Sequence, residues 1–118
     1  MQYMITFRQG EVIFVPFPFS DQTTAKQRPA VIVSSNEYNS SRADVIIAAI
    51  TSVVRVIWIG DYRLRDWKEA GLVKPSVAKA TLATIDKDMI KRKLGILTQT
   101  DLDGLSKSLI KVIEFKRV

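Results

Sequence analysis

Three short apolar runs between residues 10 and 52 constrain what this chain can fold into. They cover residues 12–15, 30–33 and 45–50, and polar loops separate them. β-Branched and aromatic residues dominate the runs, which favours strands over helices. The third run is apolar throughout, so we expect it to form a strand that is buried on both faces. This stretch therefore predicts the central strands of a sheet.

The rest of the sequence predicts further strands. We expect a strand pair within residues 55–65, a strand over 76–85 and a short one at 95–97. Trp58 lies inside an apolar run and is expected in the core. Residues 1–9 could add a strand or an ordered tail, and a polar loop is expected at 20–27. Loops or single helical turns are expected at 36–44, 66–72 and 86–93.

One long helix is predicted near the C-terminus, over residues 100–115. Its apolar residues recur at spacings of three and four, which places them on one face. Thr100 and Asp103 form the expected capping pair. Gly104 inside the helix costs ~1 kcal/mol relative to alanine, so packing must hold the helix. Together the elements predict a mostly β (α+β) fold, in which five to seven short strands form a strongly curved antiparallel sheet or partial barrel.

The length of 118 residues predicts a single domain, 1–118. Hydrophobic residues make up 47% and charged residues 25%, which is ordinary for a globular chain. No apolar run approaches the roughly 20 residues that a membrane span needs. The first residues do not follow the pattern of a signal peptide. We therefore expect a cytoplasmic protein that does not contact a membrane.

The composition also limits the available chemistry. The chain has neither histidine nor cysteine, which excludes Ser–His and Cys–His nucleophilic pairs and thiolate zinc sites. Pairs of aspartates near helix starts are better explained by the helix dipole than by metal binding, and no phosphate-binding glycine loop occurs. We expect no metal and no cofactor. The formal net charge of +6 favours a polyanion or an acidic partner, although solubility alone explains such a charge equally well.

Arg28 is the first candidate for a functional residue. Pro29 biases the backbone of Arg28 toward an extended conformation as it enters the second apolar run. A guanidinium held at the start of a strand suits a bidentate contact with a phosphate. On spacing alone, an ion pair with a carboxylate such as Asp21 explains this arginine at least as well.

Thr51 and Ser52 stand where the third run ends. A threonine at this position most often satisfies a free backbone group. If the second and third runs pair antiparallel, however, residue 28 lies near residue 51. An arginine and a hydroxyl placed together could bind a scissile phosphate without a metal, because RNA supplies its own 2′-hydroxyl nucleophile.

Other residues are open to two interpretations. Lys91, Arg92 and Lys93 could contact phosphates, but a solvated charged face explains them better. Trp67 could stack on a base or belong to the core.

Several motifs, in order along nearly the whole chain, resemble the MazF/PemK family of toxin–antitoxin ribonucleases. The matching segments are Gly10-Glu11-Val12 leading into Pro16-Phe17-Pro18-Phe19, Arg28-Pro29-Ala30 leading into Val33-Ser34, the Ile-Thr-Ser end of 46–52, Ala70-Gly71-Leu72, Pro75-Ser76-Val77, 84–87 and Leu94-Gly95. Arg-Pro-Ala followed at this distance by Thr-Ser is the most specific of them.

The resemblance implies an SH3-like barrel that forms a homodimer. It also implies metal-independent, sequence-specific cleavage of single-stranded RNA to 2′,3′-cyclic phosphate and 5′-hydroxyl ends, which would inhibit translation and growth. The family's functional arginine and threonine map onto Arg28 and Thr51, and we expect Lys26, Gln27 and Ser52 to contact RNA. The implied protein partner is a cognate antitoxin, expected to be small and acidic and to bind through a disordered C-terminal segment.

Two departures and two alternatives accompany this interpretation. The loop before Arg28 lacks the glycines of many members, and residues 78–83 lack a polar Asp-Gln pair. A non-enzymatic gyrase inhibitor similar to the CcdB proteins is one alternative, which the absence of a tryptophan near the C-terminus disfavours. The other is an RNA-binding module without catalysis.

Overall fold

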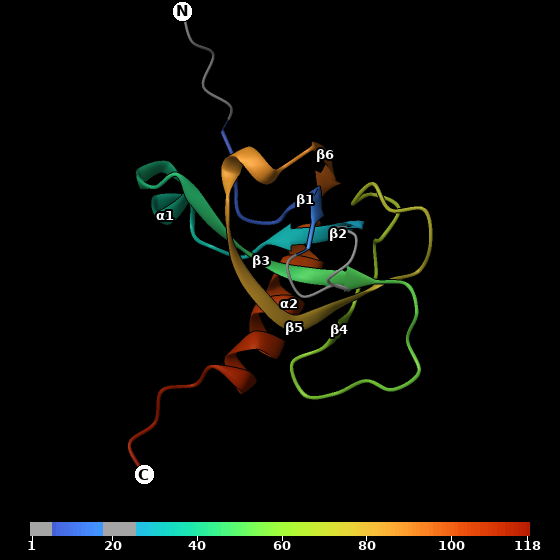
Figure 1. Ribbon diagram of the computed structural model, residues 1–118. Helices are drawn as coiled ribbons and strands as arrows, with labels where there is room; N and C mark the ends of the chain where they lie inside the picture. Colours follow the sequence, from blue (N-terminus) through green and yellow to red (C-terminus); the bar gives the residue numbers. More distant parts are fainter. Residues whose placement is uncertain (1–5, 18–25) are drawn as a thin grey trace, which may run out of the picture.

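The computed structural model describes residues 6–17 and 26–118, in which six strands form one sheet (Figure 1). The strands are β1 (Glu11–Pro16), β2 (Gln27–Ile32), β3 (Asp44–Thr51), β4 (Tyr62–Arg63), β5 (Val77–Asp86) and β6 (Arg92–Ile96). Their order is β4-β5-β3-β2-β1-β6, and every pairing is antiparallel. The helices are α1 (Asn36–Ser41), the 3-10 turn η1 (Lys87–Met89) and α2 (Gln99–Val112).

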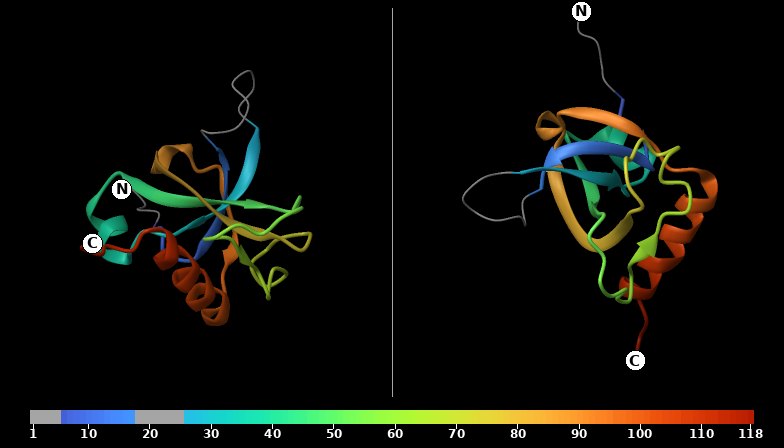
Figure 2. Two further views of the ribbon diagram at one scale, coloured as in Figure 1. Left: turned by 90° about the horizontal axis from the view of Figure 1, so that it is seen from below. Right: turned by 90° about the vertical axis from the view of Figure 1, so that its right-hand side faces the viewer.

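The sheet is strongly curved into a half-barrel, and α2 packs against one side of it (Figure 2). This arrangement confirms the predicted mostly β fold with a C-terminal helix. Within the two described ranges, no helix is long and apolar enough to cross a membrane.

Alternation along the strands produces two apolar cores. On β1, Ile13 faces one core and Val12 faces the other, because successive strand residues point to opposite faces. The first core also holds Ile32 and Ile47 from the neighbouring strands. The second core is completed by Leu105 of α2, which is 1% exposed. The central strand β3 contributes to both cores, as its apolar sequence predicts.

The prediction of a strand pair within residues 55–65 is wrong. Only Tyr62–Arg63 forms a strand, because a turn draws the preceding residues out of the sheet. The Asp61 carboxylate accepts from the Trp58 amide at 2.9 Å and pairs with Lys79 at 2.9 Å. Gly60 completes the turn with a φ of +92°. Trp58 is consequently 67% exposed, so its predicted place in the core is also wrong.

The start of the C-terminal helix also differs from the prediction. Thr98, and not Thr100, is the N-cap, and its side chain accepts from the Asp101 amide at 3.3 Å. The helix begins earlier because the Asp101 carboxylate is fully buried and anchors the first turn. The face of the helix turned to the sheet holds Leu105, whereas Val112 is 45% exposed.

Asp101 connects α2 to the segment that follows β4. Its carboxylate accepts from the Tyr62 hydroxyl at 2.8 Å and from the amides of Arg65 and Asp66 at 3.0 and 2.8 Å. Gly104 lets Tyr62 approach the helix, since a Cβ there would lie 2.2 Å from the ring. These contacts fix the start of the segment that follows β4 and ends at residue 76, just before β5.

The structure can be compared with the short turns that the sequence predicts at 36–44, 66–72 and 86–93. Residues 36–41 form α1, and η1 lies inside the expected 86–93 segment, but β6 starts at Arg92, earlier than expected. Residues 66–72 form the expected single turn, in which the Ala70 amide donates to the Asp66 carbonyl at 3.2 Å and Gly71 closes the turn with a φ of +83°. The alternatives for residues 1–9 lie in part, and the 20–27 loop for the most part, outside the described residues.

Candidate active site

Arg28 and Thr51 meet at one end of the sheet. β2 and β3 pair antiparallel with Ala30 opposite Ala49 and Val31 opposite Ala48, and the same register continued outward sets residue 28 opposite residue 51. Both residues line a single cavity of about 220 Å³. The expected proximity of the two predicted residues is therefore present in the structure.

Three segments of chain form the walls of this cavity. The start of β2 and the end of β3 supply two walls, and the residues before β5 supply the third. The third wall follows from the pairing of β3 with β5, where Thr51 lies opposite Val77. The lining residues are Gln27, Arg28, Pro29, Ile50, Thr51, Ser52, Val53, Leu72, Val73, Lys74 and Ser76.

The Arg28 side chain is exposed and makes no hydrogen bond or ion pair with any residue of 6–17 or 26–118. Its predicted alternative partner, Asp21, lies outside the described residues. The backbone of Arg28 is held in β2, opposite Val15 of β1. The guanidinium is thus carried by a paired strand and is open to a ligand in the cavity.

Thr51 is half-buried and has a local structural role. Its Oγ1 accepts from the Val53 amide at 3.2 Å, which shapes the turn out of β3. The Thr51 hydroxyl also donates its hydrogen to the Val53 carbonyl at 3.5 Å, a long bond that a ligand oxygen in the cavity can replace. The structural and the functional interpretations of Thr51 are therefore compatible.

Of the three other residues that are predicted to contact RNA, two line the cavity and one does not. Gln27 and Ser52 line the cavity, and both are exposed. Lys26 is exposed but does not line it. The structure thus gathers four of the five predicted site residues around one space.

Sequence reasoning missed Lys74 and Ser76, which line the third wall. Lys74 is exposed and has no ion pair with a described residue, and Ser76 donates its hydroxyl to the Lys74 carbonyl at 2.8 Å. Antiparallel pairing of the third strand with the strand at 76–85 would have placed the residues before that strand beside Thr51. That pairing is the sequence signal that could have identified Lys74 and Ser76.

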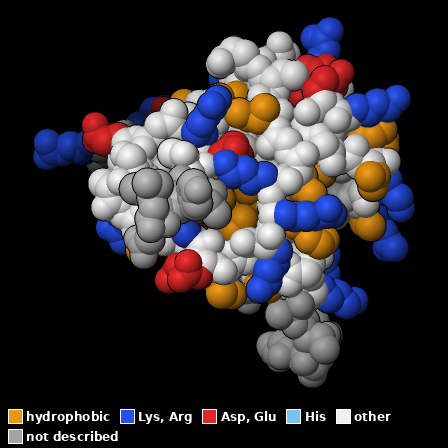
Figure 3. All heavy atoms as spheres, turned by 90° about the horizontal axis from the view of Figure 1, so that it is seen from above, with side chains coloured by type: hydrophobic (Ala, Val, Ile, Leu, Met, Phe, Trp, Pro, Cys, Tyr) orange, Lys and Arg blue, Asp and Glu red, His pale blue; other side chains and the backbone are white. Residues whose placement is uncertain are grey.

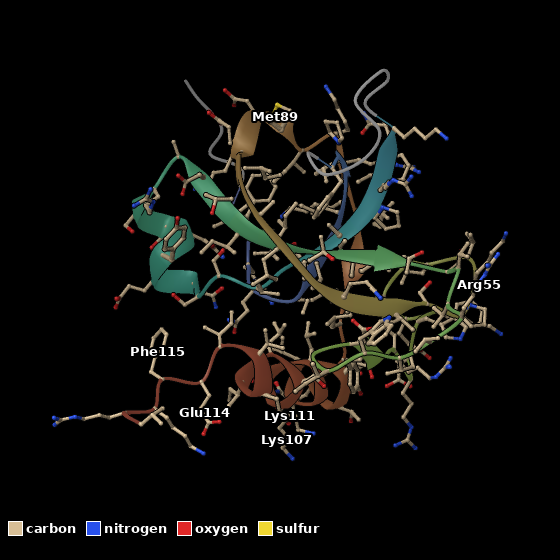
Figure 4. The ribbon with its side chains drawn as sticks, turned by 60° about the horizontal axis from the view of Figure 1, so that its bottom comes forward. Arg55, Met89, Lys107, Lys111, Glu114 and Phe115 are labelled. Carbon is tan, nitrogen blue, oxygen red and sulfur yellow. The ribbon has the colours of Figure 1, made fainter. Side chains whose placement is uncertain are left out.

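The polar side chains of the cavity lining suit an anion. Among the described residues the cavity is lined by two cations, three residues with hydroxyls and one with a side-chain amide, and by no carboxylate. Figure 4 shows a further cation, Arg55, on the segment that leaves the end of β3 and points away from the body of the molecule. Among the described residues, no cluster of three or more metal-ligating side chains occurs. The arrangement can neutralise and hydrogen-bond a phosphate group.

The sequence matches a protein family described as PemK-like, MazF-like toxin of type II toxin–antitoxin system over residues 8–113. The match spans most of the chain, and the chain belongs to this family. The resemblance inferred from the sequence motifs is thereby confirmed. A comparison with curated proteins gives no match.

Solved structures share the fold. A mycobacterial endoribonuclease in complex with its cognate antitoxin is 19% identical, with a TM-score of 0.76 over 96% of this chain and 100% of that one. The Mycobacterium tuberculosis toxin MazF-mt6 is 19% identical, with a TM-score of 0.72 over 91% of this chain and 99% of that one. A MazE-MazF structure from Deinococcus radiodurans is 16% identical, with a TM-score of 0.72 over 96% and 100%.

Proposed function

We propose that this chain is the toxin of a type II toxin–antitoxin pair and that it cleaves single-stranded RNA at the cavity between β2 and β3. The observation that carries the proposal is the shared cavity of Arg28, Thr51 and Lys74. Family membership and the endoribonucleases among its structural neighbours support the same activity. Cleavage at specific sequences in messenger RNA would inhibit translation and growth.

The reaction is an internal phosphoryl transfer that requires no water and no metal. The 2′-oxygen of one nucleotide attacks the adjacent phosphorus, and the bond from phosphorus to the 5′-oxygen breaks. The proton lost by the 2′-hydroxyl is balanced by the proton gained at the 5′-oxygen. The products are a 2′,3′-cyclic phosphate and a 5′-hydroxyl.

The side chains of the cavity act on the charge that develops on the phosphorane. Arg28 and Lys74 offer cationic donors to the non-bridging oxygens, and the Thr51 hydroxyl donates a further hydrogen bond. Preorganised donors of this kind are typically worth 10²–10³-fold in rate each. Gln27 and Ser52 hold the nucleotides on either side, and Lys26, outside the cavity, contacts the RNA backbone.

The proposal includes partners and a compartment. The chain is expected to form a homodimer in the cytoplasm and to be neutralised by a small acidic antitoxin. Two of the structural neighbours are toxins solved with their antitoxins, which supports a protein inhibitor for this chain as well. The net charge of +6 suits both RNA and an acidic inhibitor.

Cleavage of several long single-stranded RNAs in EDTA tests the activity. The wild type should cut them, and Arg28→Ala should reduce the rate at least roughly 10²-fold. Arg42→Ala is the matched control, because Arg42 pairs with Asp44 at 2.9 Å and does not line the cavity. Intact RNA with the folded wild type, or equal rates for wild type and Arg28→Ala, would refute the proposal.

A further inference from the structure

Beside the cavity, a row of side chains crosses three strands. Pro29 of β2 lines the cavity and lies opposite Phe14 of β1, and Phe14 in turn lies opposite Arg92 of β6. The Lys91 amide donates to the Phe14 carbonyl at 2.9 Å, which keeps this end of β6 beside β1. Since adjacent strands are about 4.8 Å apart, Arg92 starts only two strand spacings from the cavity wall.

The Arg92 guanidinium lies over the ring of Phe14. The guanidinium carbon lies 5.4 Å from the centre of the ring, and Phe14 is only partly buried. The Arg92 side chain is exposed and has no ion pair with a described residue. A planar cation is therefore held against an aromatic ring with its outer side open to solvent.

The neighbouring basic residues are placed differently. Lys93 pairs with Glu11 at 3.0 Å and lies over the ring of Phe7, which belongs to the first core. Phe14, by contrast, alternates with Ile13 and so shares a face with Val12 in the second core, which Leu72 of the cavity wall also joins. Of the basic residues on β6, Arg92 thus shares its face of the sheet with Pro29 and Leu72 of the cavity lining, whereas Lys93 is on the face of Arg28, which lies opposite Val15 of the first core.

The surroundings of Arg92 suit a nucleic acid strand. Figure 3 looks onto the end of the molecule that carries η1 and β6, and there Lys and Arg side chains are more widespread than Asp and Glu, with apolar side chains between them. Bases in single-stranded RNA stack on aromatic rings and on the planes of arginine side chains. An exposed arginine plane backed by a ring offers such a surface.

We propose that Arg92, held by Phe14, is a stacking subsite for a base of the RNA strand whose scissile phosphate occupies the cavity. The inference rests on the proposed function and adds to it a residue that contributes to the choice of RNA sequence. Arg92 positions a neighbouring nucleotide and takes no part in the transfer itself.

Binding to a non-cleavable RNA tests this subsite. The probe is an oligonucleotide that carries the mapped cleavage sequence, with a 2′-O-methyl group at the scissile nucleotide, in which one base at a time is replaced by an abasic site. In the wild type, an abasic site at one position next to the scissile phosphate should weaken binding roughly tenfold. Arg92→Ala should bind the intact probe roughly tenfold more weakly than the wild type does. In this variant, an abasic site at that position should no longer change the affinity.

Two further variants separate stacking from charge. Arg92→Lys should keep most of the salt dependence but lose the sensitivity to the abasic site, because an ammonium group has no plane to stack. Arg42→Ala removes another arginine that lies over a ring, 4.9 Å from the centre of Tyr38, and should behave as the wild type. An abasic profile in Arg92→Ala or Arg92→Lys that equals the wild-type profile would overturn the subsite while leaving the proposed cleavage intact. A wild type that neither cuts nor binds RNA would refute both.

Discussion

Arg28 and Thr51 face each other across the first residues of β2 and the last residue of β3, at the mouth of one cavity. The antiparallel register brings them together although 22 residues lie between them in the sequence. In the proposed reaction this juxtaposition places a guanidinium and a hydroxyl on the same phosphate.

Substitution of Thr51 separates its two roles. Thr51→Val keeps the branched shape in the strand but removes the hydroxyl, so cleavage should fall roughly 10²-fold. Thr51→Ser keeps the hydroxyl and should retain most of the rate. Single-turnover cleavage and urea unfolding should be measured together. A loss of rate in Thr51→Val that merely tracks a loss of folded protein would assign Thr51 to the turn alone.

Lys74→Ala should weaken RNA binding with a defined salt signature. Removal of one phosphate contact lowers the slope of log affinity against log salt by about 0.7 for a single strand. The measurement is the affinity for a non-cleavable RNA at several salt concentrations. Lys107→Ala is the control, because Lys107 is on α2 and lies away from the cavity lining (Figure 4). An unchanged slope in Lys74→Ala would remove Lys74 from the phosphate site.

Gly104→Ala should destabilise the fold although alanine favours helices. The new methyl group would stand 2.2 Å from the Tyr62 ring, which Asp101 holds in place. Overpacking of this kind costs about 1–3 kcal/mol, more than the ~1 kcal/mol gained in helix propensity. Urea unfolding measures the difference, with the exposed Ser106→Ala as the control on the same helix. A Gly104→Ala protein more stable than the wild type would show that Tyr62 does not pack there.

The Tyr62–Asp101 contact also predicts a dependence on alkaline pH. Burial and the hydrogen bond to the Asp101 carboxylate raise the pKa of Tyr62 from 10.0 to about 12. A pKa that is higher in the folded state stabilises the fold fully below pH 10, and this contribution is lost as the pH rises toward 12.

The free energy of unfolding of Tyr62→Phe should therefore lie below that of the wild type at pH 8, and the gap should narrow between pH 10 and 12. Urea unfolding across this range measures the gap. A gap that stays constant would contradict a raised pKa for Tyr62.

Local patterns predicted most of this fold because they repeat over several residues. The apolar runs gave β1, β2 and β3, and the proximity of residues 28 and 51 followed from antiparallel pairing alone. The apolar run around Trp58 predicts a strand in the core, but the long-range ion pair of Asp61 with Lys79 helps to hold a turn beside it. The start of α2 is likewise not predictable from local patterns, since Asp101 is anchored by residues more than 30 positions away.

The site could be predicted only in part. The apolar runs predict where the strands begin and end, and these ends carry Arg28, Thr51 and Ser52. Lys74 and Ser76 become visible only once β5 is known to pair with β3. The cavity therefore depends on a pairing between segments that no local pattern specifies.

In the proposed reaction, this cavity cleaves RNA through the 2′-hydroxyl of the substrate and without a metal. The most direct measurement is the chemical identity of both new ends after cleavage of a long single-stranded RNA in EDTA. We predict a 2′,3′-cyclic phosphate on one fragment and a 5′-hydroxyl on the other, with no cleavage next to a nucleotide whose 2′-hydroxyl is replaced by hydrogen. Fragments with a 5′-phosphate, or cleavage that needs a divalent cation, would contradict this account.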